Sequence, residues 1–119
     1  MKAFITVLLS CLLFACSTTA PITSTQDSDW NQYGFERGSK GWNLETQEQL
    51  NNASDGQQIK VSNYQAYTSG YANGQVKYCQ QDAYELGMKG EVYTGVCDSI
   101  NKDFKYDYLR GYHSHTKDM

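Results

Sequence analysis

Aromatic residues and glycines recur at helical spacing along most of this chain. In four segments an aromatic residue precedes a glycine by three or four positions, and three of these segments add a second glycine shortly afterwards. Positions i, i+3 and i+4 lie on one face of an α-helix, so each segment is predicted to carry its ring and its glycines along one stripe. The four leading pairs are Trp30 and Gly34, Tyr67 and Gly70, Tyr84 and Gly87, and Tyr108 and Gly111.

Capping residues and helix breakers divide these stripes into separate elements. Helices are predicted at about 30–40, 42–54, 64–78, 80–90 and 99–112. Residues 91–98 are predicted to be extended or looped. We therefore expect an all-α fold, in which four to five short helices form one small antiparallel cluster.

Glycine in a helix interior costs about 1 kcal/mol relative to alanine, so this many helical glycines need a compensating gain. Close approach supplies it, because a bare stripe of backbone lets a neighbouring helix or a tyrosine ring lie directly against it. The predicted packing glycines are Gly34, Gly38, Gly70, Gly74, Gly87 and Gly90. The aromatic residues expected to be buried are Trp30, Tyr67, Tyr71 and Tyr84. The alternative is an exposed tyrosine face that binds a glycan or a peptide.

The N-terminal segment has the pattern of a secretory signal. Lys2 precedes an apolar run that ends at Ala15, and the chain turns polar directly after Cys16. A cysteine in this place resembles a bacterial lipoprotein signal, in which Cys16 is diacylated and becomes the mature N-terminus. The residue after Cys16 is Ser17 and not Asp, and by resemblance to the sorting of such lipoproteins this favours the outer membrane over the inner one. The alternatives are a signal cut elsewhere and a retained anchor, although the run is shorter than the roughly 20 apolar residues that span a bilayer.

Four regions follow from these patterns. Residues 1–15 are the lipoprotein signal peptide, 16–29 the lipidated N-terminus and a flexible tether, 30–112 the Gly/Tyr-rich helical domain, and 113–119 the C-terminal tail. The tether is inferred from its Ser, Thr, Gln and Asp content, which cannot bury much apolar surface. A domain of this length has a small hydrophobic core and often needs a stabilising covalent cross-link.

Two of the cysteines can form such a cross-link. Cys11 leaves with the signal and Cys16 takes the lipid, so Cys79 and Cys97 remain. Because disulfides persist in an oxidising envelope compartment, these two are predicted to pair. A metal site and a redox pair are the alternatives, although the spacing fits neither C-x-x-C nor the paired spacings of zinc sites.

The charge balance argues against one class of partner. Once Lys2 is removed, nine basic side chains stand against thirteen acidic ones, and no basic stripe is present. Nucleic acid is therefore not an expected partner. No polybasic segment follows Cys16 either, so the lipid is predicted to hold the membrane unaided.

Motifs of catalysis are missing from the sequence. It contains no G-x-S-x-G elbow, no H-E-x-x-H helix and no phosphate-binding glycine loop. His113 and His115 could clasp a metal, but two ligands on a frayed end make a weak site, and a solvated tail is the preferred interpretation. We therefore expect no enzymatic activity, no metal and no cofactor.

One cysteine-framed segment points to a known family. It runs Tyr78-Cys79-Gln80-x-x-Ala83-x-x-Leu86-Gly87-x-x-Gly90-x-x-Tyr93-x-Gly95-Val96-Cys97. Together with Asp29-Trp30 and residues 64–74, it resembles the domain-of-unknown-function family 2799, which comprises small lipoproteins of Gram-negative envelopes. The resemblance covers nearly all of residues 29–112. It implies an envelope lipoprotein with a Cys79–Cys97 pair and with no established activity, cofactor or catalytic residue.

Two classes of function stay open. The first is a non-enzymatic structural or protein-interaction module, held on the periplasmic face of the outer membrane by the lipid on Cys16, with an unknown envelope protein or glycan as partner. The second is a small binding domain for a glycan, a peptidoglycan fragment or a peptide, which would stack on exposed Tyr or Trp rings. Burial of the aromatic residues would favour the first class, and a contiguous exposed aromatic patch would favour the second.

Overall fold

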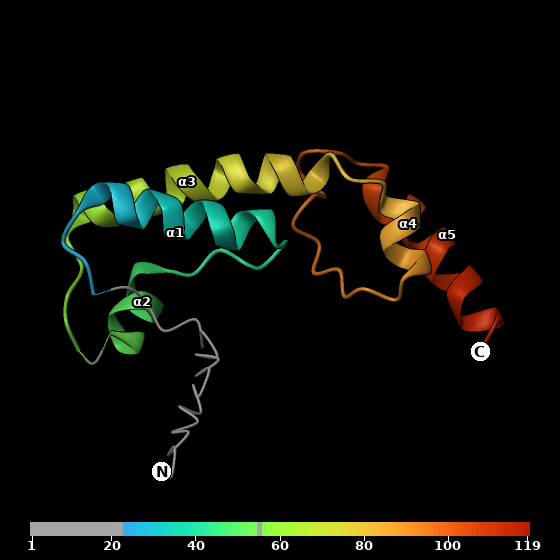
Figure 1. Cartoon of the computed structure of the whole chain (residues 1–119), viewed down its shortest axis with the longest axis horizontal. Helices are drawn as coiled ribbons and strands as arrows, with labels where there is room; N and C mark the ends of the chain where they lie inside the picture. The colour runs from blue at the N-terminus through green and yellow to red at the C-terminus, as the bar shows by residue number, and fades with distance from the viewer. Residues whose placement is uncertain (1–22, 55) are drawn as a thin grey trace, which may run out of the picture.

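The computed structural model describes residues 23–54 and 56–119, and in this part of the chain it shows five α-helices and no strand. The helices are α1 (Asp27–Ser39), α2 (Gln47–Ala53), α3 (Val61–Cys79), α4 (Ala83–Met88) and α5 (Phe104–Lys117). In Figure 1, α1 lies beside α3 in one half of the molecule and α4 beside α5 in the other. The predicted all-helical class is confirmed. The predicted signal peptide and Cys16 lie outside the described residues.

Helices α1 and α3 run in the same direction. A methyl group on Gly34 would overlap the Tyr67 carbonyl oxygen, and one on Gly38 would overlap the Tyr71 carbonyl oxygen, so the contact advances along both helices together. The antiparallel arrangement predicted for the helices is therefore wrong for this pair. Short loops produce antiparallel neighbours. Here residues 40–60 return the chain, through α2, to the end at which α1 began (Figure 1).

The second pair, α4 and α5, is also parallel. Phe104, at the start of α5, packs in one hydrophobic cluster with Ala83, at the start of α4. Towards the other end, the His115 ring of α5 lies against Gly90, just beyond α4. The long loop between the two helices again allows the chain to return to the starting end.

Each helix pair has a core of its own, so the single expected cluster is in fact two adjoining clusters. The core of the first pair contains Trp30, Tyr33, Leu50 and Tyr67. The core of the second pair contains Tyr78, Cys79, Ala83, Leu86, Cys97, Phe104 and Tyr108. Because Tyr78 and Cys79 belong to α3, the second core is built onto the end of the first pair.

The first helix of each pair, α1 in one and α4 in the other, ends in the same way. The sequence Gly-x-Lys-Gly closes both α1, at residues 38–41, and α4, at residues 87–90. The Gly41 N–H donates to the Gly38 carbonyl at 3.0 Å, and the Gly90 N–H donates to the Gly87 carbonyl at 2.9 Å. Gly41 and Gly90 have φ of 70° and 68°, the left-handed conformation that stops a helix and that glycine adopts without a steric penalty.

The second helix of each pair, α3 in one and α5 in the other, also makes an equivalent contact. The Tyr71 hydroxyl of α3 donates to the Trp42 carbonyl at 2.7 Å, and the Tyr108 hydroxyl of α5 donates to the Glu91 carbonyl at 2.6 Å. Each acceptor directly follows the left-handed glycine of its own pair. The tyrosine thereby fixes the point at which the chain leaves the first helix.

A second contact repeats with the same spacing. In each pair a ring from the second helix covers the left-handed glycine, Tyr78 over Gly41 and His115 over Gly90. These rings lie at equivalent positions when Tyr71 is aligned with Tyr108. The molecule therefore consists of two copies of one helix–crossover–helix unit, the first unit (residues 27–79) and the second unit (residues 83–117).

Backbone contact between helices explains the glycines of both units. An added methyl group would overlap a carbonyl oxygen of the opposite helix at Gly34, Gly38, Gly70, Gly74, Gly87 and Gly111. Five of these were predicted as packing glycines. Gly90 was predicted as well, but it ends α4 rather than lying in the stripe, and Gly111 takes its place opposite Gly87.

Most of the aromatic residues that accompany these glycines are buried. Trp30, Tyr67 and Tyr71 are almost inaccessible, as predicted. The prediction is wrong for Tyr84, which is 38% exposed. The reason is the length of α4, which spans less than two turns, so that its buried positions Ala83, Leu86 and Gly87 leave Tyr84 on the outer side.

Three helix boundaries differ from the predicted ones. The second helix begins after Thr46, whose side chain and that of Gln49 form a capping box, and not at residue 42. Helix α4 occupies only part of the predicted span 80–90. The last helix begins later, at Phe104, and continues to Lys117, so most of the predicted tail is helical. In the described residues, no helix is both long and apolar enough to cross a membrane.

Candidate functional site

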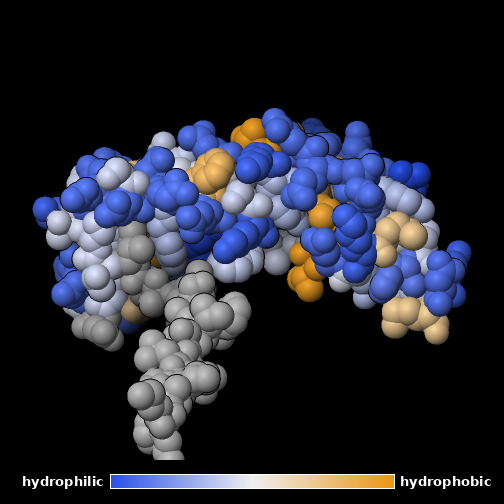
Figure 2. Space-filling model, viewed as in Figure 1, coloured by the Kyte–Doolittle hydropathy of each residue, from blue (hydrophilic) through white to orange (hydrophobic). Residues whose placement is uncertain are grey.

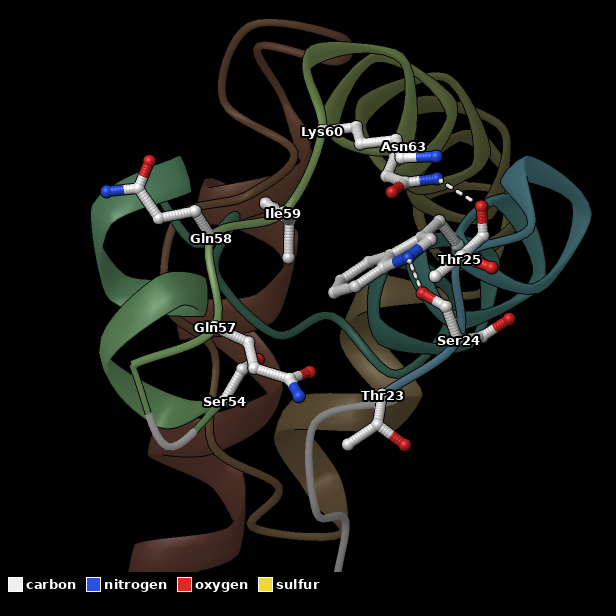
Figure 3. A pocket seen from close by; sticks show the side chains of 10 residues that line it. Thr23, Ser24, Thr25, Ser54, Gln57, Gln58, Ile59, Lys60 and Asn63 are labelled. Atoms are coloured by element: carbon white, nitrogen blue, oxygen red, sulfur yellow. Dashed lines mark hydrogen bonds between the residues drawn. The ribbon is translucent and has the colours of Figure 1, made fainter.

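A small pocket beside Trp30 lies where the N-terminal segment meets the domain (Figure 3). The Trp30 indole N–H donates to the Ser24 carbonyl at 2.8 Å. The buried Asn63 amide donates to the Thr25 carbonyl at 3.2 Å and to the Asp27 carboxylate at 2.7 Å. The cavity of about 70 Å³ has room for about two water molecules. The pocket therefore docks residues 24–27 rather than forming a site for an organic substrate.

A half-buried ion pair lies at the crossover of the first unit. Arg37 of α1 meets Glu45 of the crossover with 3.1 Å between Nε and Oε2, and the facing atoms are buried. The guanidinium also lies over the Trp42 ring at 5.0 Å and the Tyr33 ring at 5.9 Å. Aromatic faces attract cations, so these rings help to hold Arg37 in place.

Tyrosines of α3 complete this cluster from the other side. The Glu45 N–H donates to the Tyr67 hydroxyl at 3.1 Å, and the Tyr64 hydroxyl donates to the Glu45 carbonyl at 3.2 Å. Burial raises the pKa of Tyr33, with a further increase from Glu45 that Arg37 opposes. The cluster anchors the crossover between α1 and α3. It provides no activated nucleophile paired with a base, the arrangement that covalent catalysis requires.

Burial raises the pKa of six tyrosines, so the stability of the protein is expected to fall above about pH 10, the ordinary tyrosine value. These residues are Tyr33, Tyr67, Tyr71, Tyr78, Tyr93 and Tyr108. Their pKa is higher in the folded than in the unfolded chain, so the unfolded chain loses protons first and is favoured as pH rises through the folded pKa values. Tyrosinate absorbance and circular dichroism recorded together should show these six ionising with unfolding. Ionisation of all ten tyrosines in a fully helical protein would contradict this expectation.

The Cys79–Cys97 disulfide joins the end of α3 to the loop of the second unit, with the two α-carbons 5.6 Å apart. Cys97 is fully buried. Next to it, the Tyr93 hydroxyl donates to the Asp98 carboxylate at 2.6 Å and accepts from the Cys97 N–H at 3.1 Å. The predicted pairing is confirmed, and the bond fastens the loop to the first unit.

An exposed group of aromatic residues lies on the second unit. The Arg110 guanidinium of α5 lies over the rings of Tyr84 and Tyr106, at 5.4 Å and 5.8 Å from their centroids. Tyr106 is 66% exposed. Arg110 also pairs with Asp107 at 2.9 Å. This group, which we call the Arg110 cluster, presents flat rings and a cation to solvent, a combination enriched at binding surfaces.

The predicted site residues fall into three groups. Cys79 and Cys97 are brought together, and the packing glycines lie between helices as described above. His113 is exposed and His115 covers Gly90, and the described residues contain no group of three or more side chains suited to a metal. Cys16 lies outside the part of the chain that the structure describes.

Sequence reasoning missed two groups of interacting side chains. Arg37 and Glu45 meet across a helix end and a turn, and no spacing rule connects such positions. Tyr106 and Arg110 are four residues apart, a separation that places side chains on one helical face. That pair could have been found from the sequence alone.

The family comparison agrees with the resemblance seen in the sequence. The family described as "Protein of unknown function (DUF2799)" matches residues 29–113. This range includes nearly all of both units, and the chain belongs to this family.

The chain is also similar to a curated protein, the "Uncharacterized protein YfiL" of Escherichia coli (strain K12). The two are 31% identical over 106 residues, which cover 84% of this chain and 79% of YfiL. No solved structure matches the chain. The comparisons thus assign the family and leave the activity open.

Proposed function

We propose that this protein is an envelope lipoprotein, anchored to the outer membrane through a lipid on Cys16, whose folded part is a non-enzymatic interaction module. The observation that carries the proposal is the apolar run that ends in Ala15-Cys16 and is followed at once by polar residues. The Cys79–Cys97 disulfide supports an oxidising compartment, since such bonds are rare in the cytosol.

The use of the aromatic residues supports a role without catalysis. Trp30, Tyr67 and Phe104 are fully buried, and Tyr33, Tyr78 and Tyr108 also pack in the two cores. The polar groups around the pocket beside Trp30 hydrogen-bond to the protein itself. Figure 2 shows a mostly hydrophilic face with scattered apolar patches, which suits a small protein that presents a local contact surface rather than a deep substrate cleft.

The Arg110 cluster favours a second candidate, a binding domain for a glycan or a peptide. Its two exposed tyrosine rings are held in place by the cation between them. Rings fixed in this way lose little conformational entropy when a ligand stacks on them. The cluster stands on the exposed sides of α4 and α5, and side chains that project into solvent fit a groove in a macromolecule better than they enclose a small molecule.

The lipid anchor is tested by labelling and fractionation. Cells that produce the full chain with labelled palmitate should yield a labelled protein in the membrane fraction, and Cys16→Ser should abolish both label and membrane association. Cys11→Ser is the matched control, because Cys11 leaves with the signal, and it should behave like the parent. A Cys16→Ser variant that still carries label or still sediments with membranes would refute the anchor.

A further inference from the structure

The outward face of α5 carries large side chains at the spacing of a helix that enters a groove. Tyr106, Leu109, Arg110 and His113 stand at positions i, i+3, i+4 and i+7, and all four are exposed. The opposite face of α5 is the buried one, through Phe104, Tyr108 and Gly111. The i, i+3, i+4, i+7 spacing is that of the anchors of helix-in-groove recognition.

The first unit provides an internal control for this face. With Tyr71 aligned to Tyr108, the positions of Tyr106, Leu109 and Arg110 correspond to three residues of α3. These are Ser69, Ala72 and Asn73, which are also exposed. The same fold therefore forms with small side chains at these positions. The helix packing that the two units share does not require large residues at these three positions, so their side chains are available for a contact with another molecule.

The charge of this face differs from the charge of the whole protein. The chain has a formal net charge of −3, yet the outward face of α5 carries the cations Arg110, which also pairs with Asp107 of its own helix, and Lys117. An acidic surface lies on α1, where Asp29, Gln32, Tyr33 and Glu36 line an open groove. Among the described residues, neither Asp29 nor Glu36 forms a salt bridge.

We propose that the outward face of α5 binds the acidic α1 groove of a second copy of this chain. The rings of the Arg110 cluster meet the Tyr33 side of the groove, while Arg110 and Lys117 face Asp29 and Glu36. Opposite charges on the two surfaces steer the encounter and set the register. This inference gives the interaction module of the proposed function its partner, and it does not depend on lipid attachment.

The contact joins two different surfaces, so it is head-to-tail. Figure 1 places α1 and α5 in different halves of the molecule, so one copy does not close the contact on itself. A copy that uses its α5 still has a free α1 groove. Such heterologous contacts produce rings or open rows of subunits rather than closed dimers.

Zero-length crosslinking of the purified full-length chain in detergent tests the contact. A carbodiimide joins a lysine amine to a carboxylate that it touches, so mass spectrometry should find Lys117 linked to Asp29 or Glu36. Mixing ¹⁴N-labelled and ¹⁵N-labelled chains should show that the linked peptides come from different copies. Lys77, exposed on α3, is the control lysine and should give no such link.

Charge reversal makes the test specific. Arg110→Glu alone and Glu36→Arg alone should each lower the yield of the Lys117–Asp29 link, whose two partners are unchanged in both variants, by about tenfold, because like charges then face each other. The double variant restores opposite charges across the contact and should recover the parental yield of the Lys117–Asp29 link. Chains that are crosslinked only because they share a detergent micelle would not show this recovery, since their links do not depend on which charges face each other.

Links that are absent, or that persist unchanged in both single variants, would overturn the proposed self-association. Failure of the double variant to recover the yield would also overturn it, provided that the circular dichroism of the variant matches that of the parent. Because lipid attachment is scored separately by palmitate labelling, a lipidated chain that stays monomeric would refute this contact and leave the anchor standing.

Discussion

Gly70→Ala is expected to lower the free energy of unfolding by about 3 kcal/mol, the upper end of the usual cost of overpacking. The added methyl group would overlap the Asn31 carbonyl oxygen of α1, a backbone atom that cannot rotate away. Alanine gains about 1 kcal/mol of helix propensity at the same position, but this gain is smaller than the overlap penalty. The helices must separate, and the neighbouring contacts of Gly34 and Gly74 loosen with them. Urea denaturation followed by circular dichroism measures the change.

Asn73→Ala is the matched control for this substitution. Asn73 lies on the exposed side of α3, between the two packing glycines in sequence, so alanine there should be neutral or slightly stabilising. If Gly70→Ala melts at the parental temperature or above, Gly70 is not a packing residue. An exposed glycine face that binds a ligand would then become the better explanation of the stripe.

Removal of the disulfide should have an effect of similar size. Replacing both Cys79 and Cys97 by alanine is expected to cost about 3 kcal/mol, the usual value for a bridge that closes a loop of this length. The sequence separation is 18 residues, and the bond fastens the loop of the second unit to the end of α3. The second core contains both cysteines, so it should loosen before the first. Unfolding in urea with and without a reductant measures the contribution.

The reductant supplies the internal control for this experiment. It should lower the stability of the parent towards that of the double variant and leave the variant unchanged. A parent protein that is equally stable in reductant would show that the bond contributes nothing to folding. Hydrogen exchange of Phe104 and Tyr108 amides, compared with that of Tyr67, should locate the loss in the second unit.

Local spacing was enough to predict the helices and their glycine stripes. The separation of Gly34 from Gly38, or of Gly70 from Gly74, fixes one face of a helix whatever that helix packs against. The disulfide could also be predicted, because Cys79 and Cys97 are the cysteines left once Cys11 is assigned to the predicted signal and Cys16 to the predicted lipid. The first conclusion depends on residue spacing, and the second depends on the number of cysteines and on the expected oxidising compartment. Neither depends on the arrangement of the helices in space.

Helix direction and the correct register of the repeat could not be read from the same spacing. A stripe of small residues packs equally well against a parallel or an antiparallel neighbour, and the crossover at residues 40–60 decides between them. The sequence repeat suggested an equivalence of Gly34 with Gly87. The hydrogen bonds that end α1 and α4 instead make Gly38 the equivalent of Gly87, because the left-handed glycines Gly41 and Gly90 follow them by three positions.

Contacts between separate elements were the least predictable part. The ion pair of Arg37 and Glu45 depends on a turn whose path is set by three tyrosines of α3, and no local rule contains that path. Tyr84 was expected inside because it precedes a glycine by three positions. Its exposure depends on the shortness of α4, which is decided by the Asp82 cap and by Gly90.

The docking of Ser24 and Thr25 onto Trp30 and Asn63 sets a limit on how far the domain can stand from a membrane. If Cys16 carries the lipid, residues 17–22 alone separate it from Thr23, and a fully extended chain of that length reaches about 25 Å. That height is close to the thickness of one small domain, so the first unit would stay within reach of lipid headgroups. Inserting residues between Cys16 and Thr23, with the folded part unchanged, would then increase the distance from the membrane at which α5 can contact a partner.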